Sequence, residues 1–320
     1  MPSKIEWTDE TWNPVAGCTR VSPGCQHCYA ERMAKRQIAM GNKNYEGTVD
    51  KHGRWTGKIN LIPDALEKPL RWCKPRRVFV NSMSDLFHED VPDEFIGKVF
   101  AVMGDWKCSG HTFQILTKRP ERMCQIVLKH IIKPFPNVHL GVSVENQATA
   151  NERIPWLLKT PAAVRWISLE PMLGPVDLRP WLGPEIFCEL CDVACPECPY
   201  EKAVVCDEDI CDETGYLAPR TLDSIVVGGE SGPGARPMHP DWPRSVRDQC
   251  QEAGIAFFFK QWGAWGPNQS FDHGLGRKNE KEHYFDSRNR VYRVGKKSAG
   301  RILDGRTWDE LPAQGKVADG

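Results

Sequence analysis

The chain has 320 residues, of which 40% are hydrophobic and 26% charged, so it can bury a sizeable core and is not a disordered protein. Its 42 basic and 42 acidic residues cancel, so any contact with nucleic acid must come from a local patch. The start, MPSKIEW, lacks the apolar stretch of a signal peptide, and no apolar run approaches the ~20 residues that span a bilayer. We therefore expect a cytoplasmic protein without membrane contact, whose 13 cysteines bind metal or pack rather than form disulfides.

Short strand-like segments alternate with helical patterns, which predicts βα units around a parallel sheet. The clearest strands are expected at 77–81, 112–117, 138–144, 164–169, 224–227 and 255–259, with weaker ones before Cys18 and around 58–62. Helices are expected at 29–40, 93–103, 120–129, 147–158 and 240–252. About eight strands suit an α/β fold of the (β/α) TIM-type barrel class, complete or partial. An open doubly wound sheet has the same alternation, and periodicity does not separate the two.

We expect three regions along the chain. Residues 1–263 would form the barrel, interrupted at 184–219 by a cysteine-rich insertion, and residues 264–320 a C-terminal extension with a basic β-hairpin around 286–290. The insertion contains Cys188, Cys191, Cys195, Cys198, Cys206 and Cys211. Its paired C-x2-C units are typical of a small unit that folds around zinc, and an auxiliary iron–sulfur cluster is the alternative. The basic residues between 288 and 306 form either a phosphate-contacting patch or a solvated hairpin face.

Three cysteines near the N-terminus, Cys18, Cys25 and Cys28, have the spacing C-x6-C-x2-C. Three thiolates without a fourth would hold a [4Fe–4S] cube at three irons and leave one iron open to another ligand. A structural zinc site normally has four protein ligands, and the nearby candidate, His27, is wedged between two of the cysteines. The residues alone leave an iron–sulfur site, a zinc site and free buried thiols as interpretations, in that order of preference.

Polar or glycine-rich groups follow six of the expected strands. They include Asn81, Ser82, Ser84 and Asp85; Thr117, Lys118 and Arg119; Glu145 and Asn146; Ser168 and Glu170; Gly228, Gly229 and Glu230; and Lys260 and Gln261. In a barrel the carboxyl ends of the strands meet at one mouth, where such enzymes have their active sites. We therefore expect one shared site, with Glu145, Glu170 and Lys118 as candidates for catalysis. The alternative for any single group is a turn that ends its strand.

The run Cys25-Gln26-His27-Cys28-Tyr29-Ala30 resembles the cluster motif of radical S-adenosylmethionine enzymes, especially the spore photoproduct lyase-like branch, with a first gap of six residues where that superfamily usually has three. The chain as a whole resembles the phage-associated Gp37/Gp68 family. The stretches that carry this second resemblance are 7–28, 81–87, 116–120, 141–146, 168–171 and 228–232. They run across most of the chain.

The first resemblance implies an enzyme in which Cys18, Cys25 and Cys28 hold a [4Fe–4S] cluster. S-adenosylmethionine would bind the open iron, and an electron donor would reduce the cluster to generate a 5′-deoxyadenosyl radical. The stretch 81–88 resembles the serine-threonine-aspartate segment of the spore photoproduct lyase-like branch, which faces the cofactor, and Leu116-Thr117-Lys118 resembles a strand end of the same branch. We place in the cofactor-binding set Ser82, Ser84, Asp85, Thr117, Asn146, Ser168, Gly228, Gly229 and Glu230. In that set, a glycine pair would let the cofactor approach the backbone and the following carboxylate would hold an amine or ribose.

The phage association and the basic C-terminal stretch favour a nucleotide or nucleic acid as the substrate. Two alternatives stay open. One is a zinc-dependent barrel hydrolase or transferase, in which the N-terminal cysteines bind zinc with water as the fourth ligand. The other is a zinc-stabilised nucleic-acid-binding phage accessory protein, in which both cysteine groups are structural and the basic hairpin makes the contact.

Overall fold

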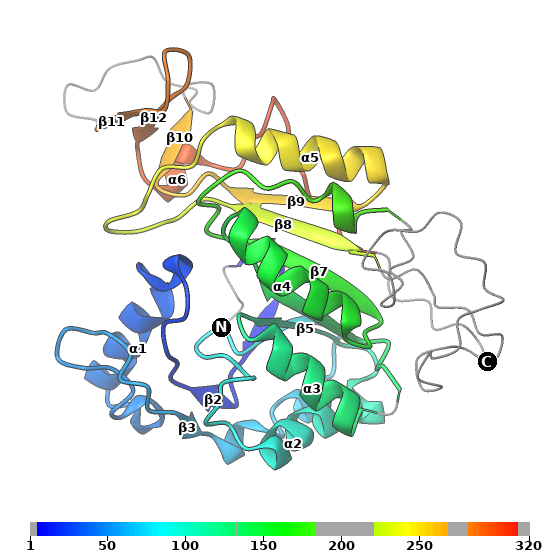
Figure 1. The fold of residues 1–320 in the computed structure, drawn as a ribbon. Helices are drawn as coiled ribbons and strands as arrows, with labels where there is room; N and C mark the ends of the chain where they lie inside the picture. Colours follow the sequence, from blue (N-terminus) through cyan, green and yellow to red (C-terminus); the bar gives the residue numbers. More distant parts are fainter. Residues whose placement is uncertain (1–4, 132, 184–220, 268–280, 313–320) are drawn as a thin grey trace, which may run out of the picture.

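The computed structural model describes residues 5–131, 133–183, 221–267 and 281–312, and one parallel sheet lies at its centre (Figure 1). The strands lie in the order β1-β4-β5-β6-β7-β8-β9, and all neighbours are parallel. Their bounds are β1 Glu10–Trp12, β4 Arg77–Val80, β5 Thr112–Thr117, β6 Val138–Ser143, β7 Val164–Leu169, β8 Ser224–Gly228 and β9 Ala256–Gln261. Among the described strands, β1 and β9 are the two edges of a curled sheet. The predicted α/β barrel is therefore confirmed in its partial form, as a half-barrel.

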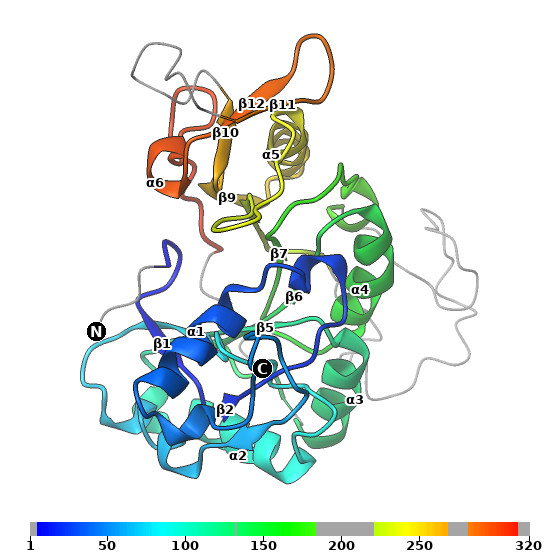
Figure 2. The ribbon, with the colours of Figure 1, turned by 90° about the vertical axis from the view of Figure 1, so that its left-hand side faces the viewer.

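Helices connect most of these strands. They are α1 Tyr29–Ala39, α2 Asp93–Met103, α3 Pro120–His130, α4 Gln147–Lys159 and α5 Asp241–Ala253. Proline occupies the first position of α3, and Gly254 ends α5 in the left-handed conformation, as expected for helix boundaries. Figures 1 and 2 show α3, α4 and α5 on the outer face of the sheet, where alternate strand residues form the main core with them.

The concave face of the sheet has a core of its own. Trp7 packs edge-on against Phe79 at 4.8 Å and Trp166 at 5.1 Å between ring centroids, and Val226 and Phe258 join this cluster. Gly141 leaves room for the Trp166 ring, since a Cβ atom there would lie 2.5 Å from it. These side chains fill the inside of the half-barrel around the middle of the strands. The polar side chains that follow the strands are left to line the space at the carboxyl ends.

One expected strand does not belong to this sheet. The segment around 58–62 forms β3 Asn60–Leu61, which pairs antiparallel with β2 Val15–Ala16 in a separate two-stranded sheet. The prediction that it is a barrel strand was wrong, because an apolar alternation indicates a strand without identifying its partner. Short 3-10 helices are η1 Pro23–Cys25, η2 Lys43–Tyr45, η3 Pro63–Ala65, η4 Pro69–Arg71, η5 Trp106–Cys108 and η6 Arg179–Trp181.

The C-terminal part forms a second, antiparallel sheet in the order β10-β12-β11 (Figure 2). Its elements are β10 Trp265–Pro267, β11 Glu282–Tyr284 and β12 Arg290–Arg293, and α6 Lys296–Ala299 follows. The chain then returns to the parallel sheet, where the Phe259 N–H donates to the Trp308 carbonyl at 2.9 Å. This return covers the edge strand β9 and so protects it from pairing with another chain.

Basic residues of the C-terminal stretch also contact other parts of this chain. Lys296 pairs with Glu6 at 3.0 Å, Arg301 pairs with Asp309, and the Arg306 guanidinium lies 3.5 Å from the centre of the Trp308 ring. The cysteine-rich insertion, with its six cysteines, lies outside the described residues. Within the described ranges, no helix has the length and apolar character needed to cross a membrane.

Candidate active site

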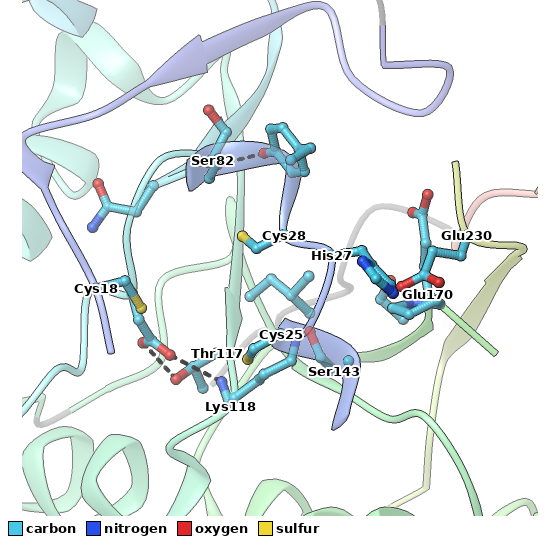
Figure 3. A pocket seen from close by; sticks show the side chains of 18 of the residues that line it. Cys18, Cys25, His27, Cys28, Ser82, Thr117, Lys118, Ser143, Glu170 and Glu230 are labelled. Atoms are coloured by element: carbon cyan, nitrogen blue, oxygen red, sulfur yellow. Dashed lines mark hydrogen bonds between the residues drawn. The ribbon is translucent and has the colours of Figure 1, made fainter. Parts of the chain in front are cut away.

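A pocket of about 420 Å³ lies at the carboxyl ends of the parallel strands (Figure 3). Most of the candidate residues outside the insertion line it, and they come from the carboxyl ends of five of the seven strands or from the loops that follow them. Those that line it are Cys18, Cys25, Cys28, Ser82, Ser84, Asp85, Thr117, Lys118, Ser168, Glu170, Gly229 and Glu230. Glu145, Asn146 and Gly228 are not among the lining residues.

The sulfurs of Cys18, Cys25 and Cys28 face a common space in Figure 3. Cys25 ends η1 and Cys28 immediately precedes α1, so the short helix and the start of α1 position these two cysteines. Burial raises the pKa of Cys18 to about 12, and the nearby Cys25 and Cys28 add to this shift. Burial also raises the pKa of Cys28. The free thiols of Cys18 and Cys28 are therefore protonated at neutral pH, and metal binding would release their protons.

Within the described part of the chain, no group of three or more His, Cys, Asp or Glu side chains is arranged to hold a metal ion. Ligands of one zinc ion must each lie about 2.3 Å from it when they are sulfurs. A [4Fe–4S] cube places each cysteine on a different iron, so its ligands stand further apart. His27 lies against Gly234 instead, where its ring is within 3.1 Å of the position of a Cβ atom. Three converging thiols, with His27 turned away, fit a cluster that has one open iron.

The loop that carries the cysteines is fixed at several points. Arg20 forms an ion pair with the buried Glu31 of α1, with a closest distance of 2.6 Å. The Ser22 hydroxyl donates to Glu145 at 2.7 Å, and Arg236 donates to the Pro23 carbonyl at 3.0 Å. These contacts tie the loop to α1 and to the segments after β6 and β8. The cysteine loop is therefore positioned by three separate parts of the fold.

Two glycines allow this loop to approach its neighbours closely. Gly17 has φ +97°, and a Cβ atom there would lie 2.1 Å from the Lys58 carbonyl oxygen. A Cβ atom at Gly24 would lie 2.4 Å from a carboxylate oxygen of Glu145. A larger residue at either position would push the loop away and displace the cysteines.

Asp85 connects the loop after β4 with the end of β5. Its carboxylate accepts hydrogen bonds from the Thr117 hydroxyl at 2.7 Å, the Lys118 N–H at 3.0 Å and Arg119 at 3.1 Å. It also accepts from the Phe87 N–H at 3.1 Å. Asp85 was predicted to contact the cofactor. In the structure its oxygens accept hydrogen bonds that join the loop after β4 to the end of β5.

Arg119 lines the pocket, and the sequence assigned it no role of its own. Its guanidinium donates to Asp85 at 3.1 Å, to Glu89 at 2.7 Å and to the Cys18 sulfur at 3.9 Å. The sequence feature that could have identified Arg119 is its position in the polar run after β5. Which acid and which sulfur it meets depends on residues far away in the chain.

Glu145 and Asn146 contact other side chains and backbone groups of the protein and do not line the pocket. Glu145 is fully buried, 3.2 Å from Arg153, and 3.7 Å from the Lys118 ammonium. Asn146 is the N-cap of α4, where its side-chain oxygen accepts from the Thr149 N–H at 3.0 Å. Lys118 thus lies between the buried Glu145 and the pocket, and it is the one of these three that lines the open space.

Two further ion pairs lie at the pocket, at the carboxyl ends of β7, β8 and β9. Glu170 accepts from the Lys260 ammonium at 2.7 and 2.8 Å and from Gln261 at 3.2 Å. Glu230 accepts from the side chain of Arg236 at 2.6 and 2.9 Å. Lys260 and Gln261 line the pocket, and the sequence noted them only as a polar strand end. Each of these carboxylates is neutralised by a cation of this chain.

The glycine pair after β8 packs against protein. A Cβ atom at Gly229 would lie 2.0 Å from the Trp262 carbonyl oxygen, and one at Gly228 would lie 3.3 Å from the carboxyl carbon of Glu170. Gly229 therefore permits the chain after β8 to cross the chain after β9. This explains the glycine independently of any bound cofactor.

The serines of the set divide into two kinds. The Ser82 hydroxyl donates to the Asn13 side chain at 3.1 Å, and the Ser84 hydroxyl donates to the Val15 carbonyl at 2.9 Å. Both connect the loop after β4 to the loop after β1. Ser168 lies beside Ser143 in the register of β6 and β7, and both are buried residues that line the pocket. The sequence missed Ser143, which closes its strand just before the expected Glu145.

A family model described as "Protein of unknown function (DUF5131)" matches residues 2–312, so the chain belongs to this family. Membership of the Gp37/Gp68 family stays a prediction. Comparison with curated proteins gave no match.

Solved structures of spore photoproduct lyase are similar to the chain at low scores. A double mutant with bound AdoMet and dinucleoside spore photoproduct has 11% identity and a TM-score of 0.38 over 88% of this chain and 67% of that one. A second mutant has 10% identity and a TM-score of 0.38 over 91% and 71%. A complex with dinucleoside spore photoproduct has 12% identity and a TM-score of 0.34 over 87% and 66%.

Proposed function

We propose that this protein is a radical S-adenosylmethionine enzyme, with a [4Fe–4S] cluster held by Cys18, Cys25 and Cys28. The observation that carries the proposal is the convergence of three cysteine sulfurs, with no fourth cysteine from the described residues, on a pocket at the carboxyl ends of a parallel half-barrel. In (β/α) barrels this end of the sheet is where reactions take place. With its cluster and S-adenosylmethionine bound, such a site uses one electron from a low-potential donor to cleave a C–S bond, yielding methionine and a 5′-deoxyadenosyl radical that takes a hydrogen atom from the substrate.

The residues of this chain would hold the reactants and keep water out. The clamped loop fixes the three sulfurs. Ser168 and the neighbouring Ser143 present hydroxyls to the pocket, and Lys118 and Lys260 present ammonium groups at its two sides. Glu145, Glu170 and Glu230 each form an ion pair with a cation of this chain. We therefore assign them the role of orienting those cations.

We infer that the substrate is a nucleotide or a group linked to nucleic acid. The lysines that line the pocket suit phosphate oxygens, and Tyr29 and Trp55 add aromatic rings to its wall. Tyr29 is 45% exposed, so its ring is available for contact. The basic C-terminal stretch that favoured nucleic acid in the sequence contributes Lys296 to the same pocket.

The test begins with anaerobic purification and quantification of iron, sulfide and zinc. The proposal expects close to four irons and four sulfides at the N-terminal site, and release of 5′-deoxyadenosine after reduction in the presence of S-adenosylmethionine. Short DNA and RNA oligonucleotides should increase that release if the substrate class is right. The zinc content also reports on the insertion, for which zinc or a second cluster is proposed.

Cys28→Ala should lose the N-terminal cluster and the release of 5′-deoxyadenosine. Cys73→Ala is the matched control, because Cys73 is exposed and lies outside the pocket, and it should keep both. Colourless protein with zinc at the N-terminal cysteines would overturn the proposal in favour of a zinc hydrolase or transferase or a zinc-stabilised binding protein. Full iron content and turnover in Cys28→Ala would overturn the ligand assignment.

A further inference from the structure

The guanidinium of Arg119 lies directly against one of the three cysteines. Its Nη1 donates to the Cys18 sulfur at 3.9 Å, and the Arg119 side chain is only 10% exposed. The hydrogen-bond partners described for the other two sulfurs are uncharged, and the charged groups that act on them, Arg20 and Glu31, form an ion pair with each other. Cys25 lies 3.8 Å from the Ser22 hydroxyl, and Cys28 receives backbone N–H groups at the start of α1. The three sulfurs therefore have unequal electrostatic surroundings.

Arg119 cannot easily move away from Cys18. Besides the sulfur, it donates to Asp85 at 3.1 Å, to Glu89 at 2.7 Å and to the Thr19 hydroxyl. These anchors come from the loops after β4 and after β1, and Arg119 itself follows β5. A guanidinium has a rigid, planar set of donors, so several fixed acceptors determine its place. The position of the guanidinium beside Cys18 is therefore fixed by the fold.

Asp85 and Arg119 act on Cys18 in opposite directions. The Asp85 carboxylate accepts from the Arg119 Nη1 at 3.1 Å, and the same Nη1 donates to the Cys18 sulfur, so a negative and a positive charge lie together beside the sulfur. Both side chains are at most 10% exposed, so solvent screens these charges weakly. Removing Arg119 would leave the Asp85 carboxylate near the sulfur without this cation, and removing Asp85 would leave the guanidinium paired with Glu89.

We propose that Arg119, balanced by Asp85, sets the reduction potential of the cluster through the Cys18 sulfur. This inference rests on the proposed function. One-electron reduction adds a negative charge to the cluster and its sulfur ligands. A fixed cation and an N–H···S hydrogen bond stabilise the reduced state more than the oxidised state, and such contacts are known determinants of cluster potentials. Arg119 therefore makes the cluster easier to reduce, and Asp85 limits that effect.

The experiment measures the midpoint potential of the reconstituted cluster by a redox titration followed by electron paramagnetic resonance. Arg119→Gln should shift the potential to a more negative value, by at least about tenfold in the equilibrium constant, which is 59 mV for one electron. Asp85→Asn should shift it in the positive direction. Arg119→Lys keeps the positive charge but loses the planar set of donors, so its negative shift in potential should be smaller than that of Arg119→Gln.

Arg122→Gln is the matched control, because Arg122 lies in the first turn of α3 and Arg119 is the N-cap residue of this helix. Arg122 contacts Asp93 and the carbonyl of Val91 and not a cysteine, so the potential should equal that of the wild type. If the Arg119→Gln protein does not take up a cluster, the potentials of Arg119→Lys and Asp85→Asn test the inference, because their shifts should have opposite signs. Wild-type potentials in loaded Arg119→Gln, or in both other variants, would overturn this inference and leave the proposed function standing. Wild-type protein that takes up no iron and sulfide would overturn both.

Discussion

Glu145→Gln tests the buried ion pair between Glu145 and Arg153, which lies behind the cysteine loop. Glu145 is fully buried, and the side chain of its partner Arg153 is 2% exposed. Removing one partner of a buried ion pair costs about 3–5 kcal/mol, because the other charge is left without compensation. Glutamine preserves size and can still accept from Ser22, and Arg153 keeps its 2.8 Å hydrogen bond to the Ser143 carbonyl. We therefore expect the lower end, a loss of about 3 kcal/mol in the free energy of unfolding.

The assay is urea unfolding followed by circular dichroism, with the wild type and a control measured under the same conditions. Glu67→Gln is the control, because Glu67 and Arg71 form a pair at 3.6 Å with side chains 72% and 77% exposed, and it should not change stability measurably. Adding Arg153→Met to Glu145→Gln should recover at least half of the loss, since it removes the uncompensated charge. An unfolding free energy for Glu145→Gln within about 1 kcal/mol of the wild type would refute this account of the pair.

Two further predictions concern packing and pH. Gly229→Ala should destabilise the protein strongly, because its Cβ atom would lie 2.0 Å from the Trp262 carbonyl, whereas Gly97→Ala, in the interior of α2 with nothing within 4 Å, should stabilise it by about 0.5–1 kcal/mol. Thermal unfolding of both variants measures this, and equal effects would contradict it. Burial lowers the pKa of His139 to about 4 from its ordinary 6.5. The unfolded chain therefore binds the extra proton first, so stability is full above pH 6.5 and falls by up to about 3 kcal/mol toward pH 4. Unfolding measured across this range should show a shallower acid loss in His139→Gln, and an unchanged slope would show that His139 is not responsible.

Local patterns in the sequence were sufficient to predict six strands of the parallel sheet and the gathering of polar groups at their carboxyl ends. The expected strands at 112–117 and 164–169 coincide with β5 and β7, because a short apolar run bounded by polar residues has few alternatives. The rule that parallel strands share one carboxyl edge then brings their polar ends together, whatever the details of packing. The cysteine spacing likewise predicted three ligands on one loop, and the structure places them on the same pocket.

Contacts between distant segments were decided only by the tertiary structure. Ser22 meets Glu145 across 123 residues, Arg119 meets Cys18 across 101, and Lys260 meets Glu170 across 90. A strand pattern also did not reveal that 58–62 pairs with β2 outside the main sheet. Sequence periodicity reports which face of an element is buried, whereas the partner of each charge depends on how separate elements are brought together. That is why the sequence identified the candidate acids and some of the nearby cations, such as Lys118 and Lys260, but not which cation neutralises which acid.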